Sequence, residues 1–143
     1  MTDLKGFITK GILTAMALVS IGSASLGIVK ANNWEDTAYE FSFDYNDDWT
    51  DVRQKEDDSA SYMKCIEAYD EDCGYYACVF GCDDYGRSGA ERCSYEYGYS
   101  EGVTRFHSNW VKTSHNYAYF YAYSDNVAAY GGVWSPDNYN GYK

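Results

Sequence analysis

The sequence predicts a small all-β protein, an antiparallel β-sandwich with an aromatic core that follows an N-terminal signal helix. Three observations support this fold class. Beyond residue 31 the chain contains seventeen Tyr, five Phe and four Trp but no Leu, and its only Ile is Ile66. The aromatic residues recur at every second position in several short segments, which is the spacing of side chains on one face of a strand. Gly, Asp and Asn separate these segments and indicate tight turns.

Residues 1–31 have the organisation of an export signal. Two lysines precede residues 11–29, which contain no charge, and the small residues Val29 and Ala31 occupy the two positions that a signal peptidase reads. Cleavage after Ala31 is expected to leave residues 32–143 as a single secreted domain with no stable membrane span. The alternative is an uncleaved membrane anchor, since residues 11–29 are nearly long enough to cross a bilayer, although small and hydroxylated residues dilute their apolar character.

The first half of the domain predicts three strands. Residues 39–45 alternate aromatic and polar side chains, which predicts a half-buried strand. Residues 59–68 predict a second strand, after the charged residues 50–58, which we interpret as irregular or as a sheet edge. Residues 75–82 form a compact apolar run between turns, and this pattern is typical of a short buried strand.

The second half predicts three more strands. Residues 92–99 alternate, with one cysteine and three tyrosines on one side, whereas residues 103–110 give no clear pattern. The alternation is strongest over residues 112–124, where tyrosines occupy one face and alanine and phenylalanine the other. Because both faces are apolar, we place this strand at the centre of a sheet. A last strand is expected over about residues 127–134.

The charge of the domain excludes one class of partner. Without the leader the chain keeps eight Lys or Arg against 21 Asp or Glu, a formal net charge of −13. This charge repels polyanions, and binding to them would release no condensed counterions. We therefore exclude nucleic acid as a partner and expect anionic lipid surfaces to be disfavoured.

Five cysteines are candidates for disulfide bonds. They all lie between residues 65 and 93, at Cys65, Cys73, Cys78, Cys82 and Cys93. An exported chain meets an oxidising or unreduced environment, so two bridges are expected, each stabilising the fold by about 2–4 kcal/mol. The spacing leaves open which cysteine is unpaired and how the other four are connected. The unpaired cysteine is either buried or available to link two chains into a covalent homodimer.

The acidic turns give a weak indication of calcium binding. Asp44, Asn46 and Asp48 repeat the first three ligand spacings of an EF-hand loop, but Trp49 replaces the glycine of the turn and Lys55 replaces the bidentate glutamate. We therefore interpret these turns as solvated surface, and specific calcium binding is the weaker alternative.

Cysteine and histidine give no clear sign of catalysis. Zinc coordination by Cys73, Cys78, Cys82 or Cys93 is an alternative to disulfides, but their spacing does not repeat that of a zinc knuckle. A cysteine nucleophile paired with one of the two histidines lacks the residues that usually surround an activated thiol. The sequence therefore predicts a protein that is not an enzyme and needs no cofactor.

The tyrosines suit two roles. We interpret their faces mainly as core or as the seam between sheets, because the domain has few other apolar residues to bury. The alternative is a partly exposed aromatic surface that stacks on sugars or docks a partner protein. Seventeen tyrosines exceed what one core of this size requires. We therefore expect some of them to form an exposed binding surface, foremost Tyr95, Tyr97 and Tyr99.

Several segments resemble an uncharacterised family of small secreted Gram-positive proteins that is classed only as a domain of unknown function. The matching features are a leader that ends before Asn-Asn, the aromatic strand at residues 39–45, the stretch from TDVRQKED at residues 50–57 to Ser61-Tyr62, and the ending GGVWSPD at residues 131–137. More loosely, the stretch SNWVKTSH at residues 108–115, followed by an alternating strand, resembles the lactococcin 972 type of bacteriocin. That resemblance implies a β-sandwich that interferes with wall assembly of competing cells at the lipid-linked precursor.

Two functional hypotheses follow from these observations. The first is a secreted bacteriocin-like or envelope-interacting protein that binds a cell-envelope component or surface protein of Gram-positive bacteria without catalysis. Its acidic charge is a difficulty there, because Gram-positive walls are polyanionic and divalent cations would have to bridge the acidic turns. The second is a structural or adhesive extracellular protein that assembles through strand edges and the spare cysteine.

Overall fold

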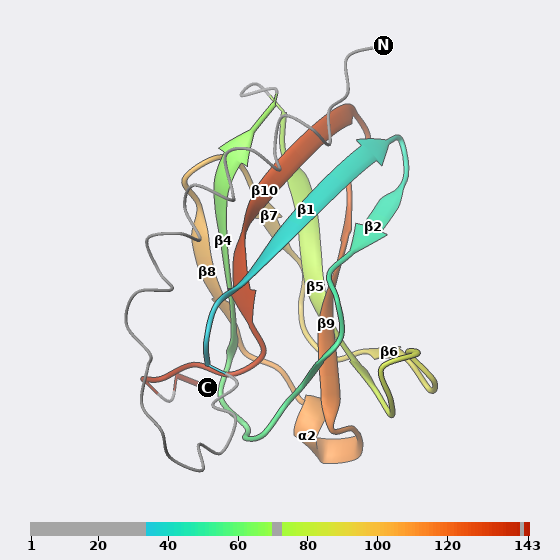
Figure 1. Cartoon of the computed structure of the whole chain (residues 1–143), viewed down its shortest axis with the longest axis vertical. Helices are drawn as coiled ribbons and strands as arrows, with labels where there is room; N and C mark the ends of the chain where they lie inside the picture. Colours follow the sequence, from blue (N-terminus) through green and yellow to red (C-terminus); the bar gives the residue numbers. More distant parts are fainter. Residues whose placement is uncertain (1–33, 70–72, 141) are drawn as a thin grey trace, which may run out of the picture.

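The computed structural model describes residues 34–69, 73–140 and 142–143, and the predicted signal segment at residues 1–31 lies outside them. The described residues form two antiparallel sheets with very little helix (Figure 1). None of the helical structure in this part of the chain is long and apolar enough to cross a bilayer. The all-β sandwich that the sequence predicts is confirmed.

One sheet has four strands in the order β1, β10, β4 and β8. Their bounds are Thr37–Asp44 for β1, Val127–Ser135 for β10, Ser61–Ala68 for β4 and Thr104–His107 for β8. The first and last long strands of the domain therefore lie side by side, and β1 is paired with β10 along its whole length.

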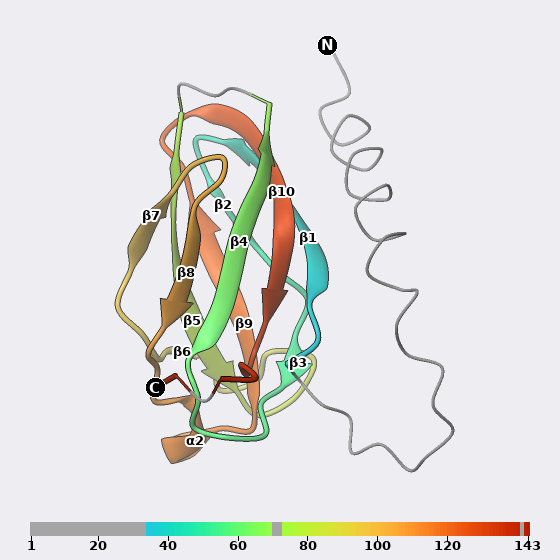
Figure 2. The same ribbon diagram turned by 90° about the vertical axis from the view of Figure 1, so that its left-hand side faces the viewer.

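The other sheet has six strands. Their bounds are Asp47–Trp49 for β2, Arg53–Gln54 for β3, Tyr75–Cys82 for β5, Glu91–Arg92 for β6, Tyr97–Tyr99 for β7 and Tyr117–Tyr123 for β9. Strand β9 pairs with β2 and β3 on one side and with β5 on the other, so the central position that we predicted for it is confirmed. The view in Figure 2 shows the two sheets as the two layers of the sandwich.

Two segments differ from the predicted strands. The strand expected over residues 92–99 is divided, because only its ends pair with β5, as β6 and β7. Between them Ser94 forms an isolated bridge with Asn109. The strand expected over residues 112–124 begins later, since one turn of helix, α2 (Val111–Ser114), comes first and buries Val111.

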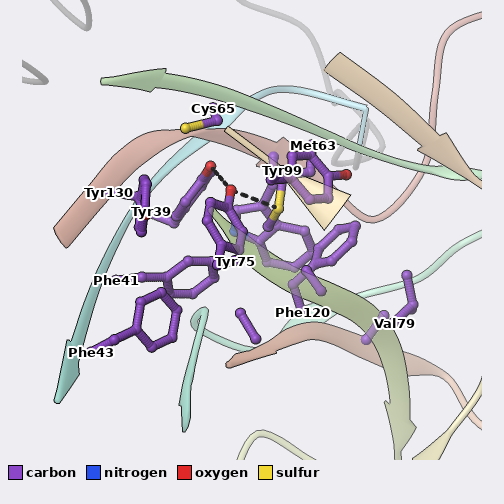
Figure 3. Packing of buried hydrophobic residues seen from close by; sticks show 14 of the residues in the cluster. Tyr39, Phe41, Phe43, Met63, Cys65, Tyr75, Val79, Tyr99, Phe120 and Tyr130 are labelled. Atoms are coloured by element: carbon purple, nitrogen blue, oxygen red, sulfur yellow. Dashed lines mark hydrogen bonds between the residues drawn. The ribbon is translucent and has the colours of Figure 1, made fainter. Parts of the chain in front are cut away.

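The core between the sheets is aromatic, as predicted. Tyr39, Phe41 and Phe43 project from β1 toward Tyr75 of β5 (Figure 3), and the rings of Phe41 and Tyr75 meet edge to face with centroids 5.5 Å apart. The hydroxyls of Tyr39 and Tyr75 share a hydrogen bond of 2.6 Å, and the Tyr75 hydroxyl also donates to the Met63 sulfur at 3.8 Å. Hydrogen bonds between the buried polar ends allow tyrosine to replace aliphatic residues in this core.

Gly132 has no room for a side chain. The pairing of β10 with β4 shifts register between Gly131 and Gly132, and a Cβ at Gly132 would collide with the backbone carbonyl oxygen of Lys64. We expect Gly132→Ala to lower the free energy of unfolding by about 1–3 kcal/mol, because strand backbone has to move. Urea denaturation measures this loss. The control is Gly98→Ala, where the nearest atom would be 3.6 Å away, and equal losses for the two variants would contradict the explanation.

The segments at residues 50–57 and 131–137 meet in the fold. The Nζ of Lys55 lies 2.8 Å from Oδ1 of Asp137, and both side chains are buried. The guanidinium of Arg53 lies over the ring of Trp134, 5.5 Å from its centroid. A buried ion pair therefore ties the two segments together.

Candidate functional site

The outer side of the six-stranded sheet carries a set of aromatic side chains that we call the tyrosine face. Along β5 and β9 every second residue points into the core, so the residues between them lie on the outer side. Neighbouring segments add one tryptophan from β2 and one tyrosine from the loop after β5. The members are Trp49, Tyr76, Phe80, Tyr85, Tyr117, Tyr119, Tyr121 and Tyr123.

The rings of the tyrosine face contact one another across the strands. Tyr76 of β5 stacks on Tyr123 of β9, with ring centroids 5.6 Å apart. Phe80 of β5 lies 5.6 Å from Tyr119 and 5.3 Å from Tyr121 of β9. These contacts fix the rings relative to one another, so the surface is largely preorganised.

Parts of the tyrosine face are strongly exposed. Tyr85 is 66% exposed, Tyr76 50% and Trp49 43%. The guanidinium of Arg87 lies 4.2 Å from the centroid of the Trp49 ring and 5.6 Å from that of Tyr119, within the range of cation–π attraction. An exposed aromatic patch of this kind is typical of a binding surface.

Two carboxylates are hydrogen-bonded to the tyrosine face. The Tyr121 hydroxyl donates to Oδ2 of Asp47 at 2.9 Å, and the Tyr123 hydroxyl donates to Oε1 of Glu96 at 3.0 Å. Burial and the bond to Asp47 raise the pKa of Tyr121 to about 12, so its hydroxyl stays protonated as a donor. Aromatic rings, hydroxyls, carboxylates and one guanidinium therefore lie within one surface.

This arrangement corrects part of the sequence interpretation. The tyrosines of β9 lie outside the layer between the sheets, because Ala118, Phe120 and Ala122 fill the inner side of that strand. Of these tyrosines Tyr119 is nevertheless buried, at 5% exposure. Among the tyrosines expected to be exposed, Tyr95 is 71% exposed and Tyr97 is half-buried.

The expectation for Tyr99 is wrong. Its ring is only 3% exposed, and its hydroxyl shares a hydrogen bond of 2.6 Å with Nε2 of His107 in the core. The division of the predicted strand explains the difference, because β7 pairs with β5 beside the core while Tyr95 lies in the interruption before it. The three residues consequently do not form one exposed surface.

No disulfide joins the five cysteines, all of which lie in the part of the chain that the structure describes. The predicted bridges are therefore absent from the structure. Cys78 and Cys82 lie on one strand, where four residues span about 13 Å, roughly twice the Cα separation that a disulfide allows. Cys65 and Cys93 are in the core cluster, and Cys73 is half-buried against it. The geometry of β5 therefore rules out a bridge between Cys78 and Cys82.

Two of the three weak calcium candidates, Asn46 and Asp48, use their side-chain oxygens within the turn after β1, and Asp44 takes part through its N–H. The Asn46 side chain accepts a hydrogen bond from the Asp44 N–H at 2.8 Å. The Asp48 carboxylate accepts the N–H groups of Ser42 and Trp49, each at 2.9 Å. These oxygens are directed at the backbone of the hairpin, which gives their sequence pattern a structural explanation.

A second cluster joins residues that the sequence did not associate. Nδ1 of His115 lies 2.8 Å from Oδ1 of Asp83, and Nε2 of the same ring lies 2.9 Å from Oε1 of Glu91. The Cys93 thiol lies beside them, because donor atoms of Glu91, Cys93 and His115 are all within 4.8 Å of one another. In the sequence, the close spacing of Glu91 and Cys93 was a usable signal that their side chains lie near each other. Nothing in the sequence linked these two residues to His115.

The electrostatics of this cluster do not support a thiol nucleophile. Burial opposes a charge on His115, but the hydrogen bonds to Asp83 and Glu91 outweigh it and raise the pKa of the imidazole. Burial raises the pKa of the Cys93 thiol, so the thiol is not activated. The other histidine, His107, is neutral in the core, because burial lowers its pKa to about 3.

Comparison with known proteins places the chain in a family. No curated protein and no solved structure is significantly similar to it. A family described as a protein of unknown function, DUF2712, matches residues 27–138. The matched region contains the tyrosine face, the buried pair of Lys55 and Asp137, and the cluster around His115. Because the match covers most of the sequence, the chain belongs to the DUF2712 family of proteins of unknown function.

Proposed function

We propose that the protein is secreted by a Gram-positive bacterium and acts as a bacteriocin-like or envelope-interacting protein, by binding and not by catalysis. The tyrosine face is the proposed contact surface. The supporting observation is the outward position of its rings on a sheet whose inner side is already packed with other residues. Its exposed members Trp49, Tyr76 and Tyr85 offer aromatic surface to a partner.

The chemistry of the tyrosine face favours a neutral glycan as the ligand. Aromatic rings pack against the C–H groups of sugar rings, and carboxylates accept hydrogen bonds from sugar hydroxyls. Asp47 and Glu96 provide the carboxylates beside the rings. The charge of −13 after residue 31 opposes binding to anionic wall polymers. The glycan strands of peptidoglycan are therefore the envelope component that we propose.

The binding test removes two aromatic side chains at the edges of the tyrosine face. We expect Trp49→Ala combined with Tyr85→Ala to weaken binding to purified peptidoglycan, stripped of anionic polymers, by about tenfold or more, which corresponds to about 1.4 kcal/mol. Both side chains are exposed, so the fold should persist. Co-sedimentation of the protein with the insoluble glycan measures the affinity.

The matched control for this test is Tyr95→Ala. Tyr95 is as exposed as Tyr85 and contacts Trp110, with ring centroids 6.0 Å apart, but it does not belong to the tyrosine face. Its replacement should leave glycan binding unchanged. Full retention of binding by the double variant, or an equal loss in Tyr95→Ala, would show that the tyrosine face is not the contact surface.

The bacteriocin-like part of the proposal has its own test. The secreted protein is expected to inhibit growth of Gram-positive cells, and Trp49→Ala with Tyr85→Ala is expected to reduce the inhibition along with the binding. Binding without any inhibition would restrict the function to envelope interaction.

The second candidate function is a structural or adhesive extracellular protein. Strands β1 and β8 are the outer strands of the four-stranded sheet, and such strands are where sheets of different chains join. A covalent assembly would use Cys73, which is half-buried, since the other four cysteines are buried. A covalent dimer or ladder on a non-reducing gel would favour this candidate, and a monomer would favour envelope binding.

A further inference from the structure

The side chains of Glu91, Cys93 and His115 bring three different donor atoms together. A carboxylate oxygen, the thiol sulfur and an imidazole nitrogen lie within 4.8 Å of one another. Glu91 belongs to β6, Cys93 follows that strand, and His115 follows α2. The fold thus assembles the cluster from two parts of the chain that are distant in sequence.

The cluster lies over Gly81 of β5. A Cβ at Gly81 would be 2.7 Å from Cδ2 of His115 and 3.0 Å from the sulfur of Cys93, so only glycine lets both side chains approach the strand. Cys93 is fully buried and His115 is 8% exposed, whereas the Glu91 side chain is 55% exposed. A buried thiol and a buried imidazole therefore lie side by side behind an exposed carboxylate.

Asp83 holds the His115 ring from its other side. Oδ1 of Asp83 lies 2.8 Å from Nδ1, while Nε2 is directed at Glu91. Histidines that bind metals almost always donate their second ring N–H to a carboxylate or carbonyl, because this bond fixes the tautomer and the orientation of the ring. The Asp83 contact supplies that arrangement.

The geometry points to a zinc site formed by Glu91, Cys93 and His115, with Asp83 orienting the imidazole and a water molecule as the fourth ligand. A set of sulfur, nitrogen and oxygen donors suits zinc, whereas calcium and magnesium take oxygen ligands. Tetrahedral zinc with bonds of about 2.0–2.3 Å holds its donors about 3.3–3.8 Å apart. The 2.9 Å between Nε2 of His115 and Oε1 of Glu91 would therefore open by a few tenths of an ångström, and the longest separation in the set, at most 4.8 Å, would close by up to about 1 Å. The exposed Glu91 side chain is free to adjust.

Binding exchanges protons for the metal ion. Zinc replaces the proton of the Cys93 thiol and a proton on Nε2 of His115, and both protons pass to solvent. Nδ1 keeps its proton and donates it to Asp83, and Glu91 binds as a carboxylate. No electron is transferred, because zinc is not redox-active.

The ion would connect β6 to the start of β9 and hold the loop between β5 and β6. That loop carries Tyr85 and Arg87 at the edge of the tyrosine face, and Asp83 begins it. Zinc should therefore stabilise the folded protein by mass action, whether or not the tyrosine face binds a glycan.

Titration of the reduced full-length protein with metal alone tests the site. We expect one Zn²⁺ per chain by calorimetry, a Tm that rises with Zn²⁺ concentration, and a thiolate-to-metal absorption band with Co²⁺ as the probe. Cys93→Ser should abolish that band. Asp83→Asn should weaken Zn²⁺ binding about 10–100-fold, the range found when a carboxylate that orients a ligand histidine is removed. Glu91→Gln should weaken it at least tenfold.

The matched control is Cys78→Ser, which removes another buried thiol of the same sheet and should leave the band and the affinity unchanged. A Co²⁺ band that survives Cys93→Ser, or a folded reduced protein that binds no Zn²⁺, would overturn the proposal. If Cys93→Ser does not fold, Glu91→Gln and Asp83→Asn decide the question, because both carboxylates are largely exposed. Unchanged Zn²⁺ affinity in both of these folded variants would also overturn it.

Discussion

Replacing Asp137 with alanine is expected to lower the free energy of unfolding by about 3–5 kcal/mol, because the change leaves a buried ammonium group without its counter-ion. The Nζ of Lys55 donates to Oδ1 of Asp137 at 2.8 Å and to the carbonyl oxygens of Ser59 and Pro136, both at 2.7 Å. The Asp137 carboxylate also accepts the N–H of Glu56 at 2.9 Å, and this bond would be lost as well. Urea denaturation at neutral pH measures the effect.

An exposed ion pair serves as the control for this prediction. Lys143 and Asp58 lie 2.6 Å apart, but both side chains are mostly in solvent, so Asp58→Ala should have a far smaller effect on the free energy of unfolding than Asp137→Ala. Adding Lys55→Met to Asp137→Ala should recover part of the loss, because it removes the unpaired buried charge. Equal losses for Asp137→Ala and Asp58→Ala, or no recovery in the double variant, would contradict the role of the buried pair.

The strand at β1 was predictable because its signal is local. Tyr39, Phe41 and Phe43 recur with a period of two, and all three are buried on one side of the strand. The apolar residues on both faces of β9 placed that strand at the centre of its sheet. Aromatic composition and alternation together were thus enough to predict the sandwich.

The tyrosine face was not predictable in the same way. Both sides of β9 are apolar, so alternation alone does not say which side meets the core. The structure places Ala118, Phe120 and Ala122 between the sheets and the tyrosines of β9 on the other side of the sheet. The small size of the alanines was a usable signal that their side of β9 faces the core. Two sheets about 10 Å apart have little room for large rings from both sheets.

The cluster around His115 depends on pairing between distant strands. Asp83 and His115 are 32 residues apart in sequence. In the fold Cys82 pairs with Tyr117, so Asp83, which follows β5, and His115, which precedes β9, reach the same place. Sequence patterns within single segments do not determine that register, which explains why the cluster was missed.

Phe41→Ala is expected to have an effect of similar size, a loss of about 3–5 kcal/mol in the free energy of unfolding. The Phe41 side chain is fully buried, and its ring centroid lies 4.6 Å from that of Tyr39, 5.7 Å from Phe43 and 5.5 Å from Tyr75 (Figure 3). The neighbours are rigid rings, so they fill a cavity less readily than flexible aliphatic side chains would. Chemical denaturation gives the loss directly.

Phe106→Ala separates the cavity effect from the loss of an aromatic ring as such. Phe106 is 42% exposed and contacts Tyr62 and Tyr142, so its truncation leaves no closed cavity and should cost no more than about 1.5 kcal/mol. Phe41→Leu should fall between the two alanine variants, because it restores most of the volume but not the ring contacts, which are worth about 0.5–1.5 kcal/mol each. A loss for Phe41→Ala as small as that for Phe106→Ala would mean that the aromatic layer repacks freely. The stability of the sandwich would then not depend on how its rings fit together.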